Sequence, residues 1–493
     1  MSRARHIKCD EGKPSCTKCT SSARTCEGYP NPKAKVSSSL PLEMRYYVPP
    51  PQNLSISLVP FQCTEMERHA FAFFCERTTK CFQSDFSSYY LLRAVHEQPA
   101  IRHAAIALGG IHETFSLNKE WLSGEGLSDP FSERQYGKAI LLLLNSAKMP
   151  SRHHSEVFLI SCLLFACFES LRGHIKSATI HVRCGMKLLH QAAASNTLAS
   201  FVYVPQKNMR LLFTHLDNQM MELGGSSVLT MLREAERLPP FPELKYPDTF
   251  RNLEDAYESF DVLLNRTLHV RRTLELFLAD PLEFSDSENI LLKIEIERTK
   301  CLQYLCHWSR ASNRYFTVEG SQQDQSSDYN ISILRIWRAA AKIFLSVKHT
   351  DGEETFDQFQ GDFNTIVTLS EAVIEASSAA DTSLPSFSFH LGILSPLFLT
   401  SIRCRDPCIR RRAFDILSNS RRCEGIWDSH LACVVAKQVI DAEAEDACPD
   451  TSGIETRDSG DKSEADTRAK ARVKTVSVEY DDCAAQVELE WAE

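Results

Sequence analysis

The longest apolar stretch of the chain is VFLISCLLFACF, residues 157–168, and only Ser161 interrupts it. It is well short of the ~20 residues that an α-helix needs to cross a bilayer. A helix that is apolar on every side lies buried inside a large core. We therefore predict a buried helix here and no membrane-spanning segment.

The sequence on both sides of this stretch has helical periodicity. Apolar residues recur on one face at three- and four-residue spacings, as in the run from Ile101 to Leu108. Strand-like alternation is almost absent between residues 59 and 444. The pattern predicts an all-α domain, either a bundle or an irregular helical array. Beyond the buried helix, we expect helices near 207–222, 254–279, 287–310, 330–347, 357–378, 387–403 and 425–444.

The composition is that of an ordinary globular protein. Hydrophobic residues make up 43% and charged residues 24% of the 493 residues. These values argue against global disorder, collagen and a membrane channel. The length could hold about three domains at roughly 150 residues each, although one large helical domain can also take it up.

The two ends of the chain differ from this helical middle. Six prolines and the run Ser37–Ser39 between Tyr29 and Gln52 predict an extended linker, without the sustained heptads of a coiled coil that would pair two copies. Residues 446–470 are polar and acidic and predict a surface loop. After them, apolar residues alternate with polar ones on either side of Asp481–Ala485, which predicts a short β-hairpin docked on the helices.

Charge is unevenly distributed along the chain. Residues 1–36 carry a net charge of +5, residues 37–440 carry −4, and residues 441–493 carry −10. A polyanion is attracted to the basic amino-terminal segment and repelled by the acidic remainder. We therefore expect any nucleic acid to bind the amino-terminal head.

Four of the eighteen cysteines lie in this head, at Cys9, Cys16, Cys19 and Cys26, with the spacing C-x6-C-x2-C-x6-C. The first residues show no basic-then-apolar leader, so we expect the protein to stay inside the cell, where thiols are kept reduced. Thiolates two residues apart can bind one zinc ion, and tetrahedral coordination replaces the core that so short a segment lacks. The alternative is a chance cluster of four thiols on a disordered arm.

These residues resemble the fungal zinc binuclear cluster family of transcription factors. The family pattern is C-x2-C-x6-C, a loop, C-x2-C and a final cysteine six to eight residues later, and its six cysteines bind two zinc ions. Residues 3–14, which run from Arg3 through His6 to Pro14, look like the family's basic helix and proline loop. The resemblance implies zinc as cofactor and makes Cys9, Cys16, Cys19 and Cys26 the third to sixth ligands, with Cys16 bridging both ions.

The first two ligands of the family pattern have no counterpart here. The second would fall at Ser2, and the first would lie upstream of Met1. Three explanations fit: a true translation start further upstream, a degenerate cluster, or a natural short form that regulates without strong DNA binding. We favour the upstream start, because the rest of the motif is intact where sequence drift should have eroded it.

The same resemblance implies a role for each basic residue of the head. Arg5 and His6 correspond to positions that contact base edges in the major groove, whereas Arg3 and Lys8 lie nearer to phosphate. Arginine can bind guanine through two hydrogen bonds, and a cation on phosphate adds affinity without sequence information. The expected partners are double-stranded DNA with CGG-like elements and transcription co-regulators, and the expected location is the nucleus. The alternative is a solvated basic arm that contacts any polyanion.

The middle of the chain resembles the family's regulatory region, the fungal-specific transcription factor domain. The similar stretches include Phe73–Thr78, Pro99–Ala104, Ala107–Glu113, Ser161–Phe165 and Glu424–Trp427. Most of these are packing motifs. The whole chain is thus interpreted as a zinc-cluster head at 1–28, a linker at 29–58, a helical regulatory domain at 59–445, an acidic loop at 446–470 and a hairpin at 471–493.

No enzyme signature is present in the sequence. It lacks G-x-S-x-G, the phosphate-binding G-x-x-x-x-G-K-[ST] loop and H-E-x-x-H, and His103 and His112 are better explained as helix or core residues. The run Arg410–Arg412 is interpreted as a solvated helix face. We predict a zinc-dependent, sequence-specific regulator of RNA polymerase II transcription that is not an enzyme. The alternative is a helical interaction protein that has lost DNA binding.

Overall fold

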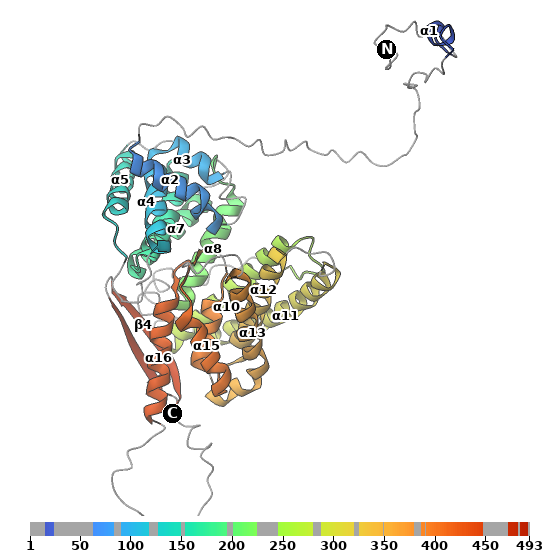
Figure 1. The fold of residues 1–493 in the computed structure, drawn as a ribbon. Helices are drawn as coiled ribbons and strands as arrows, with labels where there is room; N and C mark the ends of the chain where they lie inside the picture. Colours follow the sequence, from blue (N-terminus) through green and yellow to red (C-terminus); the bar gives the residue numbers. More distant parts are fainter. Residues whose placement is uncertain are drawn as a thin grey trace, which may run out of the picture. The chain divides into compact units, whose positions relative to one another are not determined.

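The computed structural model describes most of the chain, in two compact units, Met1–Val59 and Pro60–Glu493. Figure 1 shows the fold. In the first unit the described segment contains helix α1 (Thr17–Thr20). The second unit, which we call the body, contains all the other described elements. The described residues are 15–23, 63–82, 90–117, 127–148, 153–194, 201–223, 245–279, 287–319, 325–348, 350–378, 386–389, 391–446, 472–481 and 484–491.

In its described residues the body is all-α apart from two small sheets, as the sequence predicts. Its first group of helices is α2 (Glu65–Glu76), η1 (Thr78–Cys81), α3 (Leu92–Glu97), α4 (Pro99–Leu117), α5 (Pro130–Ala147), α6 (His154–Leu171), α7 (Ile175–Ala194) and α8 (Gln206–Leu223). The second group is α10 (Leu253–Ala279), α11 (Ser287–Glu319), α12 (Gln325–Ser346), η6 (Glu353–Phe359), α13 (Gln360–Ser378), α14 (Leu394–Arg403), α15 (Pro407–Asn419) and α16 (Ser429–Asp446). The strands are β1 (Ser386–Ser388), β2 (Arg422–Glu424), β3 (Trp427–Asp428), β4 (Val473–Asp481) and β5 (Ala484–Trp491).

Several helices begin where the sequence supplies a cap. Thr64 and Glu67 form a reciprocal capping box at the start of α2. Asp129 accepts hydrogen bonds from backbone N–H groups of the first turn of α5, and Asp406 does the same for α15. Both aspartates precede a proline, whose missing N–H costs nothing at the first helical position. Local sequence therefore sets these boundaries.

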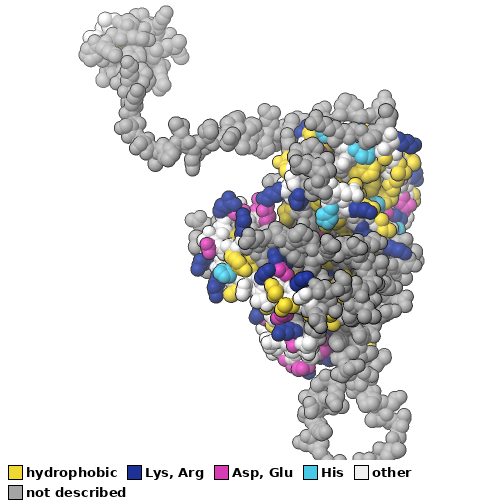
Figure 2. Space-filling view, turned by 180° about the vertical axis from the view of Figure 1, so that it is seen from behind, with side chains coloured by type: hydrophobic (Ala, Val, Ile, Leu, Met, Phe, Trp, Pro, Cys, Tyr) yellow, Lys and Arg dark blue, Asp and Glu magenta, His cyan; other side chains and the backbone are white. Residues whose placement is uncertain are grey.

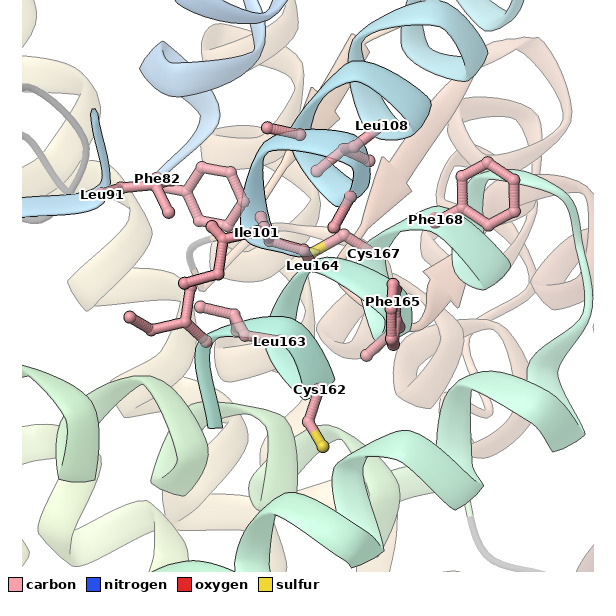
Figure 3. Close-up of a cluster of buried hydrophobic side chains, with 14 of the residues drawn as sticks. Phe82, Leu91, Ile101, Leu108, Cys162, Leu163, Leu164, Phe165, Cys167 and Phe168 are labelled. Carbon is pink, nitrogen blue, oxygen red and sulfur yellow. The ribbon is translucent and has the colours of Figure 1, made fainter. Parts of the chain in front are cut away.

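Helix α6 is the centre of the first hydrophobic core. The core includes Ile101 and Leu108 from α4 and Leu164 and Cys167 from α6, and Figure 3 shows these side chains lying together. By length and hydropathy alone, α6 could cross a membrane, but 83% of it is buried inside the body. It is the predicted buried helix.

A buried carboxylate connects α6 to the segment that leads into α8. Glu156 is 1% exposed, and its two oxygens accept hydrogen bonds from the backbone N–H groups of Val202, Tyr203 and Val204 at 2.7–2.8 Å. A buried carboxylate is tolerated only when its oxygens are satisfied in this way. Glu156 thus fixes where α8 starts.

The second hydrophobic core is formed by α10 to α16. Its largest fully buried side chain, Trp308 of α11, packs against Phe260 of α10 with ring centroids 4.9 Å apart. The indole N–H of Trp308 donates to the hydroxyl of Ser259 at 3.0 Å. Aromatic packing and hydrogen bonding together fix α11 on α10.

Helix α8 and the small sheet β1-β2-β3 lie between the two cores. Phe213 and Leu216 of α8 belong to the first core, whereas Met221 of the same helix belongs to the second. In the sheet, β1 pairs parallel with β2, and β2 pairs antiparallel with β3. In Figure 1, α8 runs from the blue and cyan helices toward the yellow and orange ones.

The turn between β2 and β3 contacts α8 directly, and we call residues 424–427 the junction. The N–H of Ile426 donates to Gln219 Oε1 at 2.9 Å, and the indole N–H of Trp427 donates to Glu222 Oε2 at 2.9 Å. Ile426 belongs to the first core and Trp427 to the second. The junction therefore binds both cores to one helix.

Strands β4 and β5 form the predicted antiparallel hairpin. Val473, 1% exposed, packs against Ile402, Ala436 and Val439, and its N–H donates to Glu443 Oε1 at 3.0 Å. An isolated hairpin is marginally stable, so this contact with α14 and α16 stabilises it.

Two helices are shorter than the sequence predicts. The pattern predicts one helix over 387–403, but Ser386–Ser388 form β1 and the helix begins at Leu394. The helix expected at 425–444 begins at Ser429, after β2 and β3. Strands of two or three residues are too short to show alternation. The expected linker at 29–58 and acidic loop at 446–470 lie outside the described residues, except Asp446, which ends α16.

Gly425 provides a test of the junction. Its φ is +62°, which favours glycine, and a Cβ atom there would meet the side-chain amide of Gln219. We expect Gly425→Ala to lower the free energy of unfolding by ~1–3 kcal/mol through backbone strain and overpacking. The measurement is urea unfolding followed by circular dichroism.

The matched control is Gly137→Ala in α5, where an added Cβ would meet no atom within 4 Å. Alanine in a helix interior should raise stability there by ~0.5–1 kcal/mol. If the two variants have the same stability, the junction does not constrain the fold.

A second test concerns a buried carboxylate next to the junction. Asp428, 6% exposed, accepts the N–H of Leu431 at 2.9 Å, and burial raises its pKa from 3.8 to about 7. The native state then holds a proton that the unfolded state has released. Stability should therefore fall as pH rises from about 4 to about 7, by at most ~1.4 kcal/mol per pH unit for one such group. We expect Asp428→Asn to flatten this decline in pH-dependent urea unfolding.

Asp406 is the control, because its pKa is lowered in the folded protein whereas that of Asp428 is raised. The backbone N–H of Ile409 is the main cause that lowers the pKa of Asp406. Its stabilising effect is present at neutral pH and is lost as pH falls through the lowered pKa. Asp406→Asn should therefore weaken acid sensitivity, and an identical pH profile for both variants would contradict the assignment.

Candidate functional site

The described part of the head is a single helical turn built on two cysteines. Cys16 is the N-cap of α1, with φ −72° and ψ 145°, and Cys19 lies within the helix. The N–H of Cys19 donates to Cys16 Sγ at 3.4 Å and to Cys16 O at 3.0 Å. The two cysteines of the C-x2-C pair thus lie on the same turn, and the backbone N–H of one contacts the sulfur of the other.

This arrangement suits zinc. Thiolates are the sulfur ligands that zinc prefers, and a backbone N–H that donates to sulfur is a favourable partner for a negatively charged ligand. The hydroxyl of Thr20 donates to Cys16 O at 3.0 Å and further closes the turn. Both cysteines are thiols rather than half of a disulfide. The residues present therefore fit the metal.

The structure brings together two of the predicted site residues, Cys16 and Cys19. The other predicted ligands and DNA-contacting residues fall outside the described residues: Cys9, Cys26, Arg3, Arg5, His6 and Lys8.

Three buried cysteines of the body are surrounded by apolar residues instead. Burial raises the pKa of Cys162 to about 12 and raises the pKa of Cys167 and Cys423 well above the ordinary value. A protonated, buried thiol is a poor metal ligand and packs as a small hydrophobe. Within the described ranges, no three His, Cys, Asp or Glu residues form a group that could hold a metal ion.

The two histidines noted in the sequence have structural roles in the body. The hydroxyl of Thr78 hydrogen-bonds His112 Nδ1 at 2.9 Å, and burial lowers the pKa of His112 to about 4. His103 Nδ1 hydrogen-bonds Gln135 Oε1 at 2.7 Å. Each ring thus has its own partner among the helices of the first core.

The run Arg410–Arg412 is more than the solvated helix face that the sequence favours. Arg410, with a side chain 11% exposed, forms an ion pair with Glu443 at 2.6 Å, and Arg412 pairs with Glu371 at 2.6 Å. These pairs connect α15 to α16 and to α13. The prediction missed them because their acidic partners are about thirty to forty residues away in the sequence.

We consider two cavities that described residues of the body form. The larger, about 990 Å³, lies beside α15 and α16, and three of its four arginines pair with carboxylates. Arg405 pairs with Asp357 at 3.1 Å, while Arg410 and Arg472 share Glu443. The smaller, about 410 Å³, lies along α12 and α13. Figure 2, which views the molecule from behind, shows basic and acidic side chains interspersed over the described surface of the body.

Comparison with known protein families identifies both regions. Residues 71–427 match the fungal specific transcription factor domain, and residues 3–36 match the fungal Zn(2)-Cys(6) binuclear cluster domain. The first match covers the described body from α2 to β3, including the junction. The second includes the Cys16–Cys19 turn.

Individual relatives are transcription regulators. The chain is 25% identical to the aspercryptin biosynthesis cluster-specific transcription regulator atnN of Emericella nidulans, over 90% of this chain and 87% of that protein. It is 26% identical to the transcription regulator lscL of Purpureocillium lilacinum, over 40% of this chain and 49% of that protein. The transcriptional regulatory protein moc3 of Schizosaccharomyces pombe is 56% identical over 36 residues, 7% of each chain.

No solved structure matches the chain significantly. The family matches nevertheless cover both the helical body and the cysteine-rich head. The zinc-cluster match also identifies zinc as the cofactor. The chain therefore belongs to the fungal specific transcription factor domain family, and it is a zinc-dependent, DNA-binding transcription regulator.

Proposed function

We propose that Cys9, Cys16, Cys19 and Cys26 hold zinc in the head and that the basic segment beside them contacts double-stranded DNA. The observation that carries this proposal is the Cys16–Cys19 turn, in which one helical turn contains two thiols and a backbone N–H donates to one of them. Bound zinc supplies a tetrahedral cross-link that so short a segment needs in order to fold. The +5 net charge of residues 1–36 supports a polyanionic partner.

Within that segment, we assign sequence reading to Arg5 and His6 and phosphate contact to Arg3 and Lys8. Arginine can donate two hydrogen bonds to O6 and N7 of guanine, which favours CGG-like elements. A lysine on phosphate contributes affinity that depends on salt and not on sequence.

The remaining parts of the proposal concern the whole chain. We assign the protein to the nucleus, to RNA polymerase II transcription and to regulation rather than enzymatic catalysis. The helical regulatory domain, residues 59–445, would present surfaces to co-regulators, and the linker at 29–58 would separate it from the head. The relatives named above are transcription regulators, which supports the assignment to transcription.

Zinc content tests the assigned ligands. We expect Cys19→Ser to lose at least about half of the zinc bound per chain, because one tetrahedral thiolate ligand is removed. The measurement is metal analysis of the purified full chain by mass spectrometry. The control is Cys306→Ser, which removes an exposed thiol of the body and should leave zinc content unchanged.

If Cys19→Ser keeps full zinc content, the ligand assignment is wrong. If the wild-type chain holds no zinc and does not bind a CGG-containing duplex, the function of this chain is that of a helical interaction protein. Restoring DNA binding with zinc after chelation would support the proposal.

DNA affinity tests the basic residues. We expect Arg5→Ala to weaken binding to a CGG duplex by ~1–3 kcal/mol while affecting unrelated duplexes less. Lys8→Ala should weaken binding to all duplexes alike and reduce the salt slope by ~1. Fluorescence anisotropy over a series of salt concentrations measures both effects.

Lys437→Ala is the charge-matched control, because Lys437 is exposed on α16 of the body. The Lys437→Ala variant should bind the CGG duplex and unrelated duplexes with the affinity of the wild type. Equal losses for Arg5→Ala on specific and unrelated duplexes would contradict the base-reading role.

A further inference from the structure

The smaller cavity of the body is a groove formed by α11, α12 and α13, and we call it the α12–α13 groove. Its volume is about 410 Å³, within the range of sites that hold small molecules. Apart from Leu369, the described residues that line it are Asn313, Arg335, Arg338, Asn364, Thr365 and Thr368. The described lining thus contains two cations and four polar neutral residues, with no carboxylate.

Both arginines are held on one face of α12. They are three residues apart, so their side chains project from the same side of the helix. Arg338 Nη1 donates to Asn313 Oδ1 at 3.0 Å, which connects α12 to α11. The guanidinium of Arg335 lies over the ring of Phe316, 5.5 Å from its centroid. These contacts orient the two guanidinium groups.

Two carboxylates of α13, the helix that contributes most of the lining, already have other cationic partners. Asp362 accepts a hydrogen bond from Lys342 Nζ at 2.6 Å, and Glu371 binds Arg412. Burial and the neighbouring Arg335 both lower the pKa of Arg338, while Asp362 opposes this effect. The positive charges of Arg335 and Arg338 therefore repel each other, and an anion bound between them would reduce this repulsion.

The neutral residues of the groove also present donors. Arg412 donates to Asn364 Oδ1 at 3.1 Å and to the hydroxyl oxygen of Thr368 at 3.3 Å. Because these oxygens accept from Arg412, the amide NH2 of Asn364 and the hydroxyl hydrogen of Thr368 are left to donate elsewhere. The lining of the groove thus contains two guanidinium groups, an amide and a hydroxyl that can donate hydrogen bonds.

We propose that the α12–α13 groove binds the phosphate group of a small phosphomonoester. A phosphate carries about two negative charges and three acceptor oxygens, which match two arginines and two neutral donors. A carboxylate has one charge and would leave donors unused. The groove volume leaves space for a small organic group attached to the phosphate. This inference goes beyond the proposed function, since it assigns a ligand to the body and does not depend on the head.

The larger cavity gives an internal comparison. Three of its four arginines, Arg405, Arg410 and Arg472, pair with Asp357 and Glu443. Its lining also contains three further carboxylates, Asp406, Asp415 and Asp441. Of these two cavities, the α12–α13 groove is the one that combines a described lining without carboxylates and two adjacent arginines.

Isothermal titration calorimetry of the full-length protein tests the proposal, with glycerol 3-phosphate and inorganic phosphate as probes and glycerol as the neutral control at constant ionic strength. We expect one binding site per chain for glycerol 3-phosphate and no binding of glycerol. Arg335→Gln and Arg338→Gln should each weaken binding at least about tenfold, because each removes a charge-assisted donor pair.

The matched control is Lys437→Gln, which removes the same charge from an exposed position on α16 and lies outside the groove. Its affinity for glycerol 3-phosphate should stay within about twofold of the wild type. Because Arg335 is exposed, the Arg335→Gln variant should fold. It therefore tests phosphate binding even if the Arg338→Gln variant does not fold.

Three results would overturn the proposal. One is no binding of either phosphate probe to the wild type, and another is equal weakening by Lys437→Gln and Arg335→Gln. The third is a loss of duplex DNA affinity in Arg335→Gln without any phosphate binding, which would make the groove a nucleic-acid contact. Cys19→Ser protein should bind glycerol 3-phosphate like the wild type, so failure of the head and failure of the groove are distinguishable.

Discussion

The arrangement of the two hydrophobic cores of the body depends on the 424–427 junction, which donates two hydrogen bonds to α8. Gln219 accepts the N–H of Ile426, and Glu222 accepts the indole N–H of Trp427. Buried donors that lose their acceptors cost more free energy than the hydrogen bonds themselves contribute. Hydrophobic packing holds each core together, but this directional contact sets how one core is oriented against the other.

The sequence predicts much of this fold, because long helices leave a strong periodic signal. The run 157–168 becomes the buried part of α6, and the expected helices at 207–222 and 254–279 agree closely with α8 and α10. The hairpin is also predictable, since β4 and β5 are long enough to alternate. Strands β1 to β3 escape prediction because two or three residues are too short to alternate, and because β1 pairs with a strand distant in sequence, as in Phe387 with Cys423.

The two candidate sites differ in how far sequence reveals them. The cysteines of the head lie close together along the chain, so their spacing already predicts a metal site, and Cys16 and Cys19 meet on one turn. The α12–α13 groove combines residues from three helices. In the sequence, Arg335 and Arg338 resemble any solvated helix face, and only the fold shows that the surrounding carboxylates are bound elsewhere.

The position of α8 limits how this protein can be recombined with its relatives. Gln219 lies against Gly425, where even one extra carbon atom would meet its amide, and Glu222 accepts from Trp427. A chimaera that replaces Gln219 or Glu222 by an apolar residue would leave the N–H of Ile426 or the indole N–H of Trp427 without its acceptor, although about two hundred residues separate the two segments.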